Sequence, residues 1–227
     1  NAERIDSRPP PVKSKTESPT EQSLTFNVPT TFVELPSKGQ FYDPTHPLHQ
    51  EPLLEIKHMT MKEEEILNSQ SLIQRGVAID RLVSSLVVDK SIDPTSLLLG
   101  DKNAICMAAR IDAYGADYNI NITCKACTHE NEVVFDLGDI GVKSLDPMEG
   151  AVFLENGNLA LTLPRTGATV EVKFLTSRDE EIVSHYVKKN KKLGIENLLS
   201  LQYKQMIVSV NGDESIQTIS DFIGAMP

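Results

Sequence analysis

Two neighbouring stretches near the middle of the chain alternate apolar and polar residues with the two-residue period of a β-strand. Apolar side chains recur at every second position over residues 118–124 and again over residues 133–137. Between these stretches lie Cys124, Cys127 and His129, spaced like one half of a zinc ribbon. The pattern therefore predicts a half-buried β-hairpin over residues 116–137 with a metal-type turn at its tip.

Upstream of this hairpin, the pattern predicts one strand followed by several helices. Residues 54–59 alternate as a short strand, and Thr60 with Glu63 forms a capping box for a helix that runs to about residue 74. Glutamates at 63–65 favour the first helical turn, where the helix dipole stabilises negative charge. A helix is expected over 77–88. A short helix should follow, with Asp93 as its cap and Pro94 as its first residue, running through 97–99 and ending at Gly100, and another over 102–114 with Asp101 as its cap.

Downstream of the hairpin, strands come before helices. Asn156 and Gly157 suit a tight turn between strands at 152–154 and 159–163. A strand over 170–175, a helix over 178–190, an amphipathic helix over 195–208 and a helical turn around 220–223 complete the chain. Lysines at 188, 189, 191 and 192 would suit an anionic partner, yet cations are favourable at any helix C-terminus.

One turn–strand–helix unit occurs twice, on either side of the hairpin. Residues 54–67 align without gaps to residues 170–183, and LPSKG at 35–39 resembles LPRTG at 163–167. Each copy combines a turn, a strand with outward Glu and Lys, a Thr cap and an acidic first turn. Strand-to-helix junctions can converge on such residues, but the gapless match favours duplication. The elements together predict an α+β fold.

The same features divide the chain into four parts. Residues 1–30 are polar and proline-rich, and we expect them to form an extended arm that becomes ordered by draping over a partner. Residues 31–115 comprise a turn-rich loop up to residue 54, a strand and a helical subdomain. Residues 116–150 hold the CxxC hairpin and a linker. Residues 151–227 form a small sheet with helices, which contains the second copy of the repeat.

Composition narrows the function classes. Lys and Arg total 22 and Asp and Glu total 32, giving a net charge of −10. General nucleic-acid binders need basic surface to displace counterions from phosphate, so nucleic acid is not an expected partner. No apolar run approaches the roughly 20 residues of a membrane span, and no signal-peptide core is present at the start of the sequence. We expect synthesis in a reducing cytoplasm.

The metal interpretation of the hairpin tip stays open. A closed zinc site needs four ligands, whereas Cys124, Cys127 and His129 supply three. The HxxH pair of His46 and His49 could complete the set within one chain. A site shared between subunits, or a turn that keeps its cysteines without metal, would fit the sequence too. Thioredoxin-like chemistry is disfavoured, because its CxxC motif stands at a helix N-terminus rather than at a hairpin tip.

The sequence contains none of the common catalytic motifs, such as a GxSxG elbow, an HExxH helix or a Walker loop. The histidines occur in unlike contexts without an obvious nucleophile. His58 aligns with Phe174 of the second copy, which indicates packing. No catalytic residue is predicted, and no cofactor other than zinc.

Several segments resemble the T-even-type bacteriophage baseplate hub protein family: FVELPSKGQFY, LLEIKHMTMKEEEIL, GVAIDRLVSSLVVDK, LLLGDKNAICMAARIDAYG and ITCKACTHENEVVFDL. The resemblance is best over residues 32–137. It implies a non-enzymatic structural subunit of a contractile tail baseplate, located in the virion and acting in hub and tail-tip assembly. Its partners would be other baseplate and hub proteins in a symmetric homo- or hetero-oligomer, with residues 1–30 and 31–54 as the expected interfaces. The alternatives are a zinc-ribbon adaptor that recruits a protein partner and, third, a metal-dependent hydrolase using His46, His49 and the cysteines.

Overall fold

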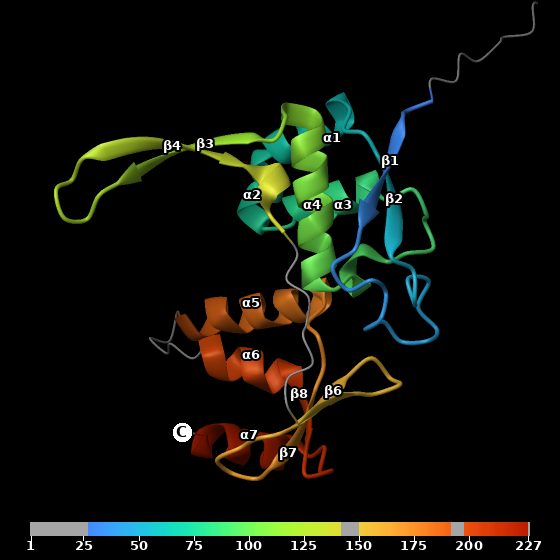
Figure 1. Ribbon diagram of the computed structural model, residues 1–227, viewed down its shortest axis with the longest axis vertical. Helices are drawn as coiled ribbons and strands as arrows, with labels where there is room; N and C mark the ends of the chain where they lie inside the picture. The colour runs from blue at the N-terminus through green and yellow to red at the C-terminus, as the bar shows by residue number, and fades with distance from the viewer. Residues whose placement is uncertain (1–26, 142–149, 192–197, 227) are drawn as a thin grey trace, which may run out of the picture.

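The computed structural model describes residues 27–141, 150–191 and 198–226. Figure 1 shows two lobes, one above the other, with a long hairpin projecting sideways from the upper lobe. The described residues form seven α-helices and three small antiparallel sheets, which confirms the α+β fold. Most of the predicted arm over 1–30, residues 142–149 of the predicted linker, Ile195 and the end of the lysine run lie outside the described residues.

The N-terminal lobe consists of β1 (Thr30–Glu34), β2 (Leu53–Lys57), α1 (Met61–Asn68), α2 (Gln70–Arg75), α3 (Ala78–Leu86), the 3-10 helix η1 (Pro94–Ser96) and α4 (Leu99–Tyr114). β1 pairs with β2 in antiparallel register, with Val33 opposite Leu54. Both residues are buried against apolar side chains of α3 and α4, which makes this the larger core of the molecule. Its fully buried members include Leu35, Ile56, Leu86, Leu97 and Ile105.

Three helix predictions in this lobe differ from the structure. The short helix expected to end at Gly100 is the 3-10 helix η1, which ends at Ser96, and Leu97 and Leu98 have extended backbone. The helix expected to run from Thr60 to about 74 is divided at Ser69, whose extended backbone ends α1 and precedes α2. The helix expected to begin after Asp101 begins at Leu99, so Gly100 and Asp101 lie inside its first turn. Asp101 is not a cap, because its carboxylate accepts hydrogen bonds from residues far away in the sequence.

The central hairpin, β3 (Asp117–Thr123) and β4 (Glu130–Asp136), is present as predicted but is not half-buried. It extends away from the lobes in Figure 1, and the two strands make most of their contacts with one another. Tyr118, Ile122 and Phe135 remain 43–46% exposed. The alternation agrees with the prediction, but most of the apolar face that it creates stays exposed, and Arg110 of α4 lies over the Tyr118 ring at 5.9 Å from its centroid.

The C-terminal lobe contains β5 (Ala151–Phe153), β6 (Leu159–Thr162), β7 (Thr169–Val172), α5 (Ser177–Lys191), α6 (Leu198–Met206), β8 (Ile207–Val210) and α7 (Ile216–Ala225). Its strands form one sheet in the order β5-β6-β7-β8. The predicted tight turn is confirmed, with Gly157 at φ +81°. The helix predicted over 195–208 is wrong at its end, because Ile207 leaves α6 and pairs with Val172. α7 is longer than the single turn predicted and begins after Ser215.

The two lobes repeat one hydrogen-bonding plan. After β1, Leu35 N–H donates to the Pro52 carbonyl at 2.8 Å, and after β6, Leu163 N–H donates to the Ala168 carbonyl at 2.9 Å. In each lobe the next strand follows this turn: β2 in the N-terminal lobe and β7 in the C-terminal lobe. The chain then passes through helices and returns to pair with that strand. The return is the Ile56–Val87 bridge in the N-terminal lobe and the pairing of β8 with β7 in the C-terminal lobe. The similarity therefore extends well beyond the stretch that the sequence alignment covers.

Candidate functional site at the junction of the two lobes

The residues predicted to bind metal lie at the tip of the β3–β4 hairpin. Cys124 N–H donates to the His129 carbonyl at 2.9 Å, and Thr128 N–H donates to the Cys124 carbonyl at 2.8 Å. Backbone N–H groups of Cys127 and Ala126, together with the Cys127 thiol, lower the pKa of the Cys124 thiol. Such a turn favours a thiolate, as one half of a zinc ribbon does.

The complete metal site is not assembled among the described residues. They contain no group of three or more His, Cys, Asp or Glu side chains arranged to hold an ion. Among the described residues His129 is therefore not grouped with the two cysteines. Zinc at these residues remains a prediction, and the zinc-ribbon adaptor gains no support.

The HxxH pair has a structural role in the turn-rich loop. His46 Nε2 lies 2.8 Å from Ser96 Oγ, and its Nδ1 accepts a hydrogen bond from Leu48 N–H at 3.1 Å. His49 Nδ1 lies 2.8 Å from the Tyr42 carbonyl oxygen. These contacts fix the path of the loop, and neither histidine joins the hairpin cysteines in a metal-binding group.

Glu63 is the best-connected side chain of the first repeat unit, and it is fully buried. Its carboxylate accepts hydrogen bonds from Lys57 Nζ at 2.8 Å, Ser85 Oγ at 2.5 Å, and Thr60 N–H and Oγ1 at 3.0 and 2.5 Å. Burial alone would raise the pKa of Glu63, but these donors outweigh it and lower the pKa to about 2. The predicted capping box is confirmed, and Lys57 and Ser85 are additional partners that helix-cap reasoning does not find.

Asp179 makes the same set of contacts in the second unit. It accepts hydrogen bonds from Lys173 Nζ at 2.7 Å, Gln205 Nε2 at 2.6 Å, and Thr176 N–H and Oγ1 at 2.9 Å each. Burial opposes ionisation here too, and the donors again lower the pKa of the carboxyl group. Each unit therefore joins its strand, its first helix and a later helix through one buried carboxylate.

A third buried carboxylate, Asp101, connects the LPSKG turn to the start of α4. It accepts hydrogen bonds from Ser37 N–H at 3.0 Å, Ser37 Oγ at 2.6 Å and Tyr42 OH at 2.7 Å. The Tyr42 hydroxyl oxygen in turn accepts from Leu98 N–H at 3.2 Å. Burial and the neighbouring carboxylate raise the pKa of Tyr42 well above its ordinary value. Two sequence motifs that lie more than 60 residues apart thus meet in one network.

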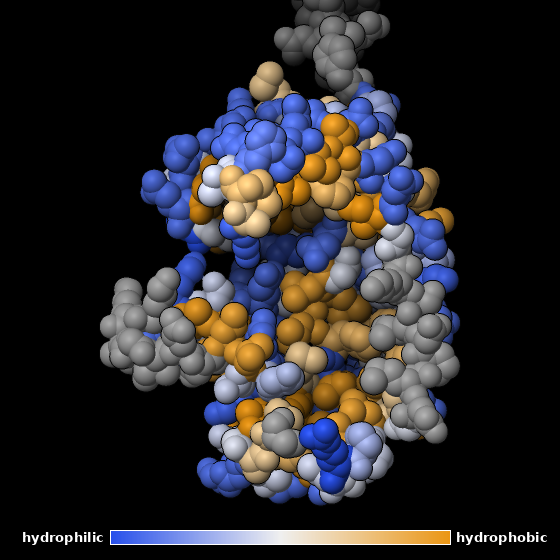
Figure 2. Space-filling model, turned by 60° about the vertical axis from the view of Figure 1, so that its left-hand side comes forward, coloured by the Kyte–Doolittle hydropathy of each residue, from blue (hydrophilic) through white to orange (hydrophobic). Residues whose placement is uncertain are grey.

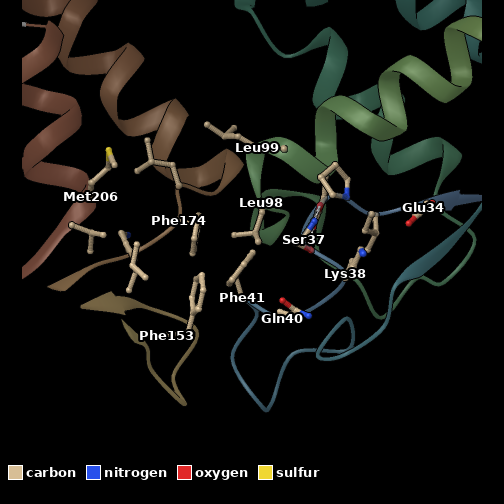
Figure 3. Close-up of a pocket in the computed structure, with 18 residues that line it drawn as sticks. Glu34, Ser37, Lys38, Gln40, Phe41, Leu98, Leu99, Phe153, Phe174 and Met206 are labelled. Atoms are coloured by element: carbon tan, nitrogen blue, oxygen red, sulfur yellow. Dashed lines mark hydrogen bonds between the residues drawn. The ribbon is translucent and has the colours of Figure 1, made fainter. Parts of the chain in front are cut away.

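The two lobes meet directly beside this network. Leu99 N–H donates to the Leu175 carbonyl at 3.0 Å, and Ser177 N–H donates to the Leu97 carbonyl at 2.9 Å. The ring of Phe41, from the N-terminal lobe, stacks on Phe174 at a centroid distance of 4.2 Å. Figure 3 shows the resulting cavity of about 790 Å³, lined by Phe41, Leu98, Leu99, Phe153, Phe174 and Met206 among others.

The polar side chains buried around the junction are hydrogen-bonded. Among the described residues, every buried side-chain nitrogen and oxygen has a hydrogen-bond partner. The three buried carboxylates are therefore engaged in holding segments together. Fold and junction together describe an α+β protein in which two similar turn–strand–helix units pack against one another.

The family comparison identifies the type of structural protein. The model of the family described as "T4 bacteriophage base plate protein" matches residues 28–227, so the chain belongs to that family. The family indicates a structural rather than an enzymatic role and a location in the virion tail, together with other tail proteins. Searches of curated proteins and of solved structures found no match. Within the described residues, every helix is too short or too polar to cross a membrane.

Proposed function

We propose that this protein is a hub or tail-tip subunit of a contractile-tail baseplate and that it works through protein–protein contacts. The observation that carries the proposal is the contrast between a fully satisfied interior and an uncovered hairpin. Tyr118, Ile122 and Phe135 are 43–46% exposed on one face of an element that projects from the body. Exposed apolar residues gathered in this way mark interaction surfaces.

The remaining parts of the chain have proposed roles in the same assembly. Within the 31–54 segment, Leu35, Tyr42 and Leu48 belong to the core, whereas Phe32 and Leu53 are 65% and 51% exposed. These two residues are the part of that segment which we propose as an interface. The arm over residues 1–30 is proposed as a second contact. Residues 31–115 and 151–227 would then form the body that carries these contacts. The hairpin and linker of 116–150 connect the two parts of that body.

Purified tail particles provide the test. We expect the chain to be present in a fixed ratio to the other baseplate proteins, and near the tail axis when an internal tag is located by electron microscopy. Tail particles that lack the chain would overturn the proposal. A peripheral position would contradict the hub assignment and leave the family assignment intact.

A further inference from the structure

We infer that the junction between the two lobes is repeated between molecules: the segment that precedes α7 in one chain docks on the turn that precedes α1 in a second copy. This would be one of the protein–protein contacts of the proposed function, on which the inference rests. Each of the two surfaces is the counterpart of a surface that the chain already buries against itself.

The junction within the chain joins the turn before α5 to the segment before α4. Two backbone hydrogen bonds, described above, place Leu98 opposite Thr176 in an antiparallel bridge. Leu97, Leu98 and Ser177 are at most 7% exposed there. Figure 2 shows hydrophobic surface gathered in the hollow between the two lobes, beside this junction. A strand-to-helix turn of the second unit is thus covered by an extended segment of the first lobe.

The first unit has the same turn, but no described segment pairs with it. The gapless alignment of the two units places Thr60 at the position of Thr176 and Met61 at that of Ser177. Both threonines bind the buried carboxylate of their unit, so the two turns are built alike. Ser177 is 1% exposed, whereas Met61 is 74% exposed, and the Met61 N–H has no backbone partner among the described residues. The edge that is covered in the second unit is therefore open in the first.

The segment before α7 corresponds to the segment before α4. In each lobe the chain returns beside the second strand, turns, and enters a helix that packs on the sheet. The carbonyl of the residue before each helix, Leu98 or Ser215, accepts the first helical hydrogen bond. Ser215 therefore corresponds to Leu98, and Ile216 to Leu99. Ile216 is 85% exposed and Met61 is 74% exposed, the two highest values among the large apolar residues that the structure describes.

These two open surfaces lie at opposite ends of the molecule. In Figure 1, α1 lies near the top of the upper lobe and α7 at the bottom of the lower lobe. Stacked repeats need a polar face on each terminal unit to remain soluble as single bodies, but here each end presents an exposed apolar residue. The two ends cannot meet within one chain, so the occupant of each is a second copy. Such head-to-tail contacts close into rings when the rotation between neighbouring subunits permits.

The existing junction defines the bonds expected between molecules. Met61 N–H should donate to the Glu214 carbonyl of the second copy, as Ser177 N–H does to the Leu97 carbonyl within the chain. The Ile216 N–H of that copy should donate in return to the Met59 carbonyl. Because backbone groups make these bonds, the contact tolerates different side chains in the two junctions.

One ion pair of the existing junction has a counterpart too. Arg178, the second residue of α5, lies 3.0 Å from Asp93, which accepts a hydrogen bond from the N–H two residues later. Lys62 is the second residue of α1, and Asp213 makes the same turn before α7. We therefore expect Lys62 to pair with Asp213 of the second copy. The acidic residues that follow each basic residue are shared by both units, so they are compatible with such a contact: Glu64 and Glu65 in the first, Glu180 and Glu181 in the second.

Met61→Glu and Ile216→Glu, each in the full chain, test the two surfaces. Both residues are the first of their helix, where an acidic side chain is favourable, so both variants should fold. Leu199→Glu is the matched control, because Leu199 is 66% exposed in the first turn of α6 and belongs to neither surface. Sedimentation velocity over a range of protein concentrations should show self-association of the wild type and of the control. Met61→Glu and Ile216→Glu should each associate at least about tenfold more weakly, as expected when a charge replaces an apolar contact.

Met61→Pro tests the backbone bond separately. Proline is favoured at the first position of a helix, and Thr60 has the extended backbone that suits a residue before proline. The substitution removes the N–H that should donate to Glu214, so association should weaken without loss of the fold. A Met61→Pro protein that melts like the wild type and associates as strongly would contradict the proposed pairing.

Mixing Met61→Glu with Ile216→Glu gives the decisive result. One intact surface of each kind remains in the mixture, so a one-to-one dimer should form and grow no further. A mixture that stays monomeric would refute the head-to-tail contact, and so would a wild type that is monomeric at every concentration.

Tail particles show whether the partner is a second copy. A carbodiimide, which joins an amine directly to a carboxylate, should link Lys62 to Asp213 of a neighbouring copy. Links from these residues to another tail protein instead would overturn the choice of a second copy. Absence of the chain from particles would overturn the proposed function, whereas the solution results concern the contact alone.

Discussion

Replacing the buried Glu63 by Gln tests whether the carboxylate networks stabilise the fold. The substitution preserves side-chain size and removes the charge. Lys57 Nζ and Ser85 Oγ both donate to Oε1, at 2.8 and 2.5 Å, while Thr60 donates to Oε2. The side-chain oxygen of a glutamine can still accept hydrogen bonds either from Lys57 and Ser85 or from Thr60. Its amide nitrogen, which is itself a donor, then faces the donors of the other group.

The size of the effect follows from the number of bonds lost. A hydrogen bond to a charged group contributes about 1.5–3 kcal/mol, and an unsatisfied buried group adds to the loss. One side of the network loses its acceptor and the ion pair with Lys57 disappears, so we expect a loss of about 3 kcal/mol. For a chain of this size each kcal/mol lowers the melting temperature by about 2–4 °C, which gives a decrease of about 6–12 °C.

Urea titration and thermal melting followed by circular dichroism measure the change. Glu65→Gln is the matched control, because Glu65 is exposed on the same helix and should alter the free energy of unfolding by less than about 0.5 kcal/mol. Asp179→Asn interrupts the equivalent network and should be destabilising in the same direction. If Glu63→Gln were as stable as Glu65→Gln, the carboxylate would not be holding the unit together.

The remaining predictions concern pH, the repeated turn and the hairpin tip. The pKa of the Glu63 carboxyl is about 2 in the folded protein and 4.5 ordinarily, so its contribution to stability is complete above pH 4.5 and is lost as the pH falls toward 2. Between these pH values the free energy of unfolding, measured by urea titration, should therefore fall more for the wild type than for Glu63→Gln. Gly39→Ala should be far more destabilising than Gly167→Ala, because a Cβ at Gly39 would lie 2.4 Å from a backbone nitrogen, whereas nothing lies within 4 Å of a Cβ at Gly167. Gly167→Ala should lower the free energy of unfolding by about 1–2 kcal/mol, because its backbone is left-handed. If zinc binds at the tip, assembled particles should contain more zinc than particles carrying Cys124→Ser and Cys127→Ser, and equal contents would exclude the site.

The elements that depend on neighbouring residues could be predicted from the sequence. The capping box at Thr60 and the turn at Gly157 are local signals, and both are found in the structure. The gapless repeat led to two units whose buried carboxylates have equivalent partners. Even so, Lys57 was expected to face outward with its neighbours, whereas it turns back to Glu63.

The features that depend on distant residues could not be predicted. Ile207 continues the apolar pattern of α6, and only the presence of β7 beside it makes it part of a strand. Asp101 had the sequence context of a helix cap, while its actual partners come from the turn at Ser37. The hairpin had the alternation of a half-buried strand pair, but alternation cannot show whether anything covers the apolar face. That information lies in the packing of the whole chain or in another molecule.

The position of the hairpin between the two repeat units has a consequence for how the protein can vary. The hairpin leaves the body after Gly115 and returns where Leu137 N–H donates to the Ala116 carbonyl at 2.9 Å. Residues could be added or removed in cross-strand pairs beyond this closure without altering either lobe. If the hairpin contacts a neighbouring baseplate protein, as proposed above, its length would set the distance between that protein and the body of this chain.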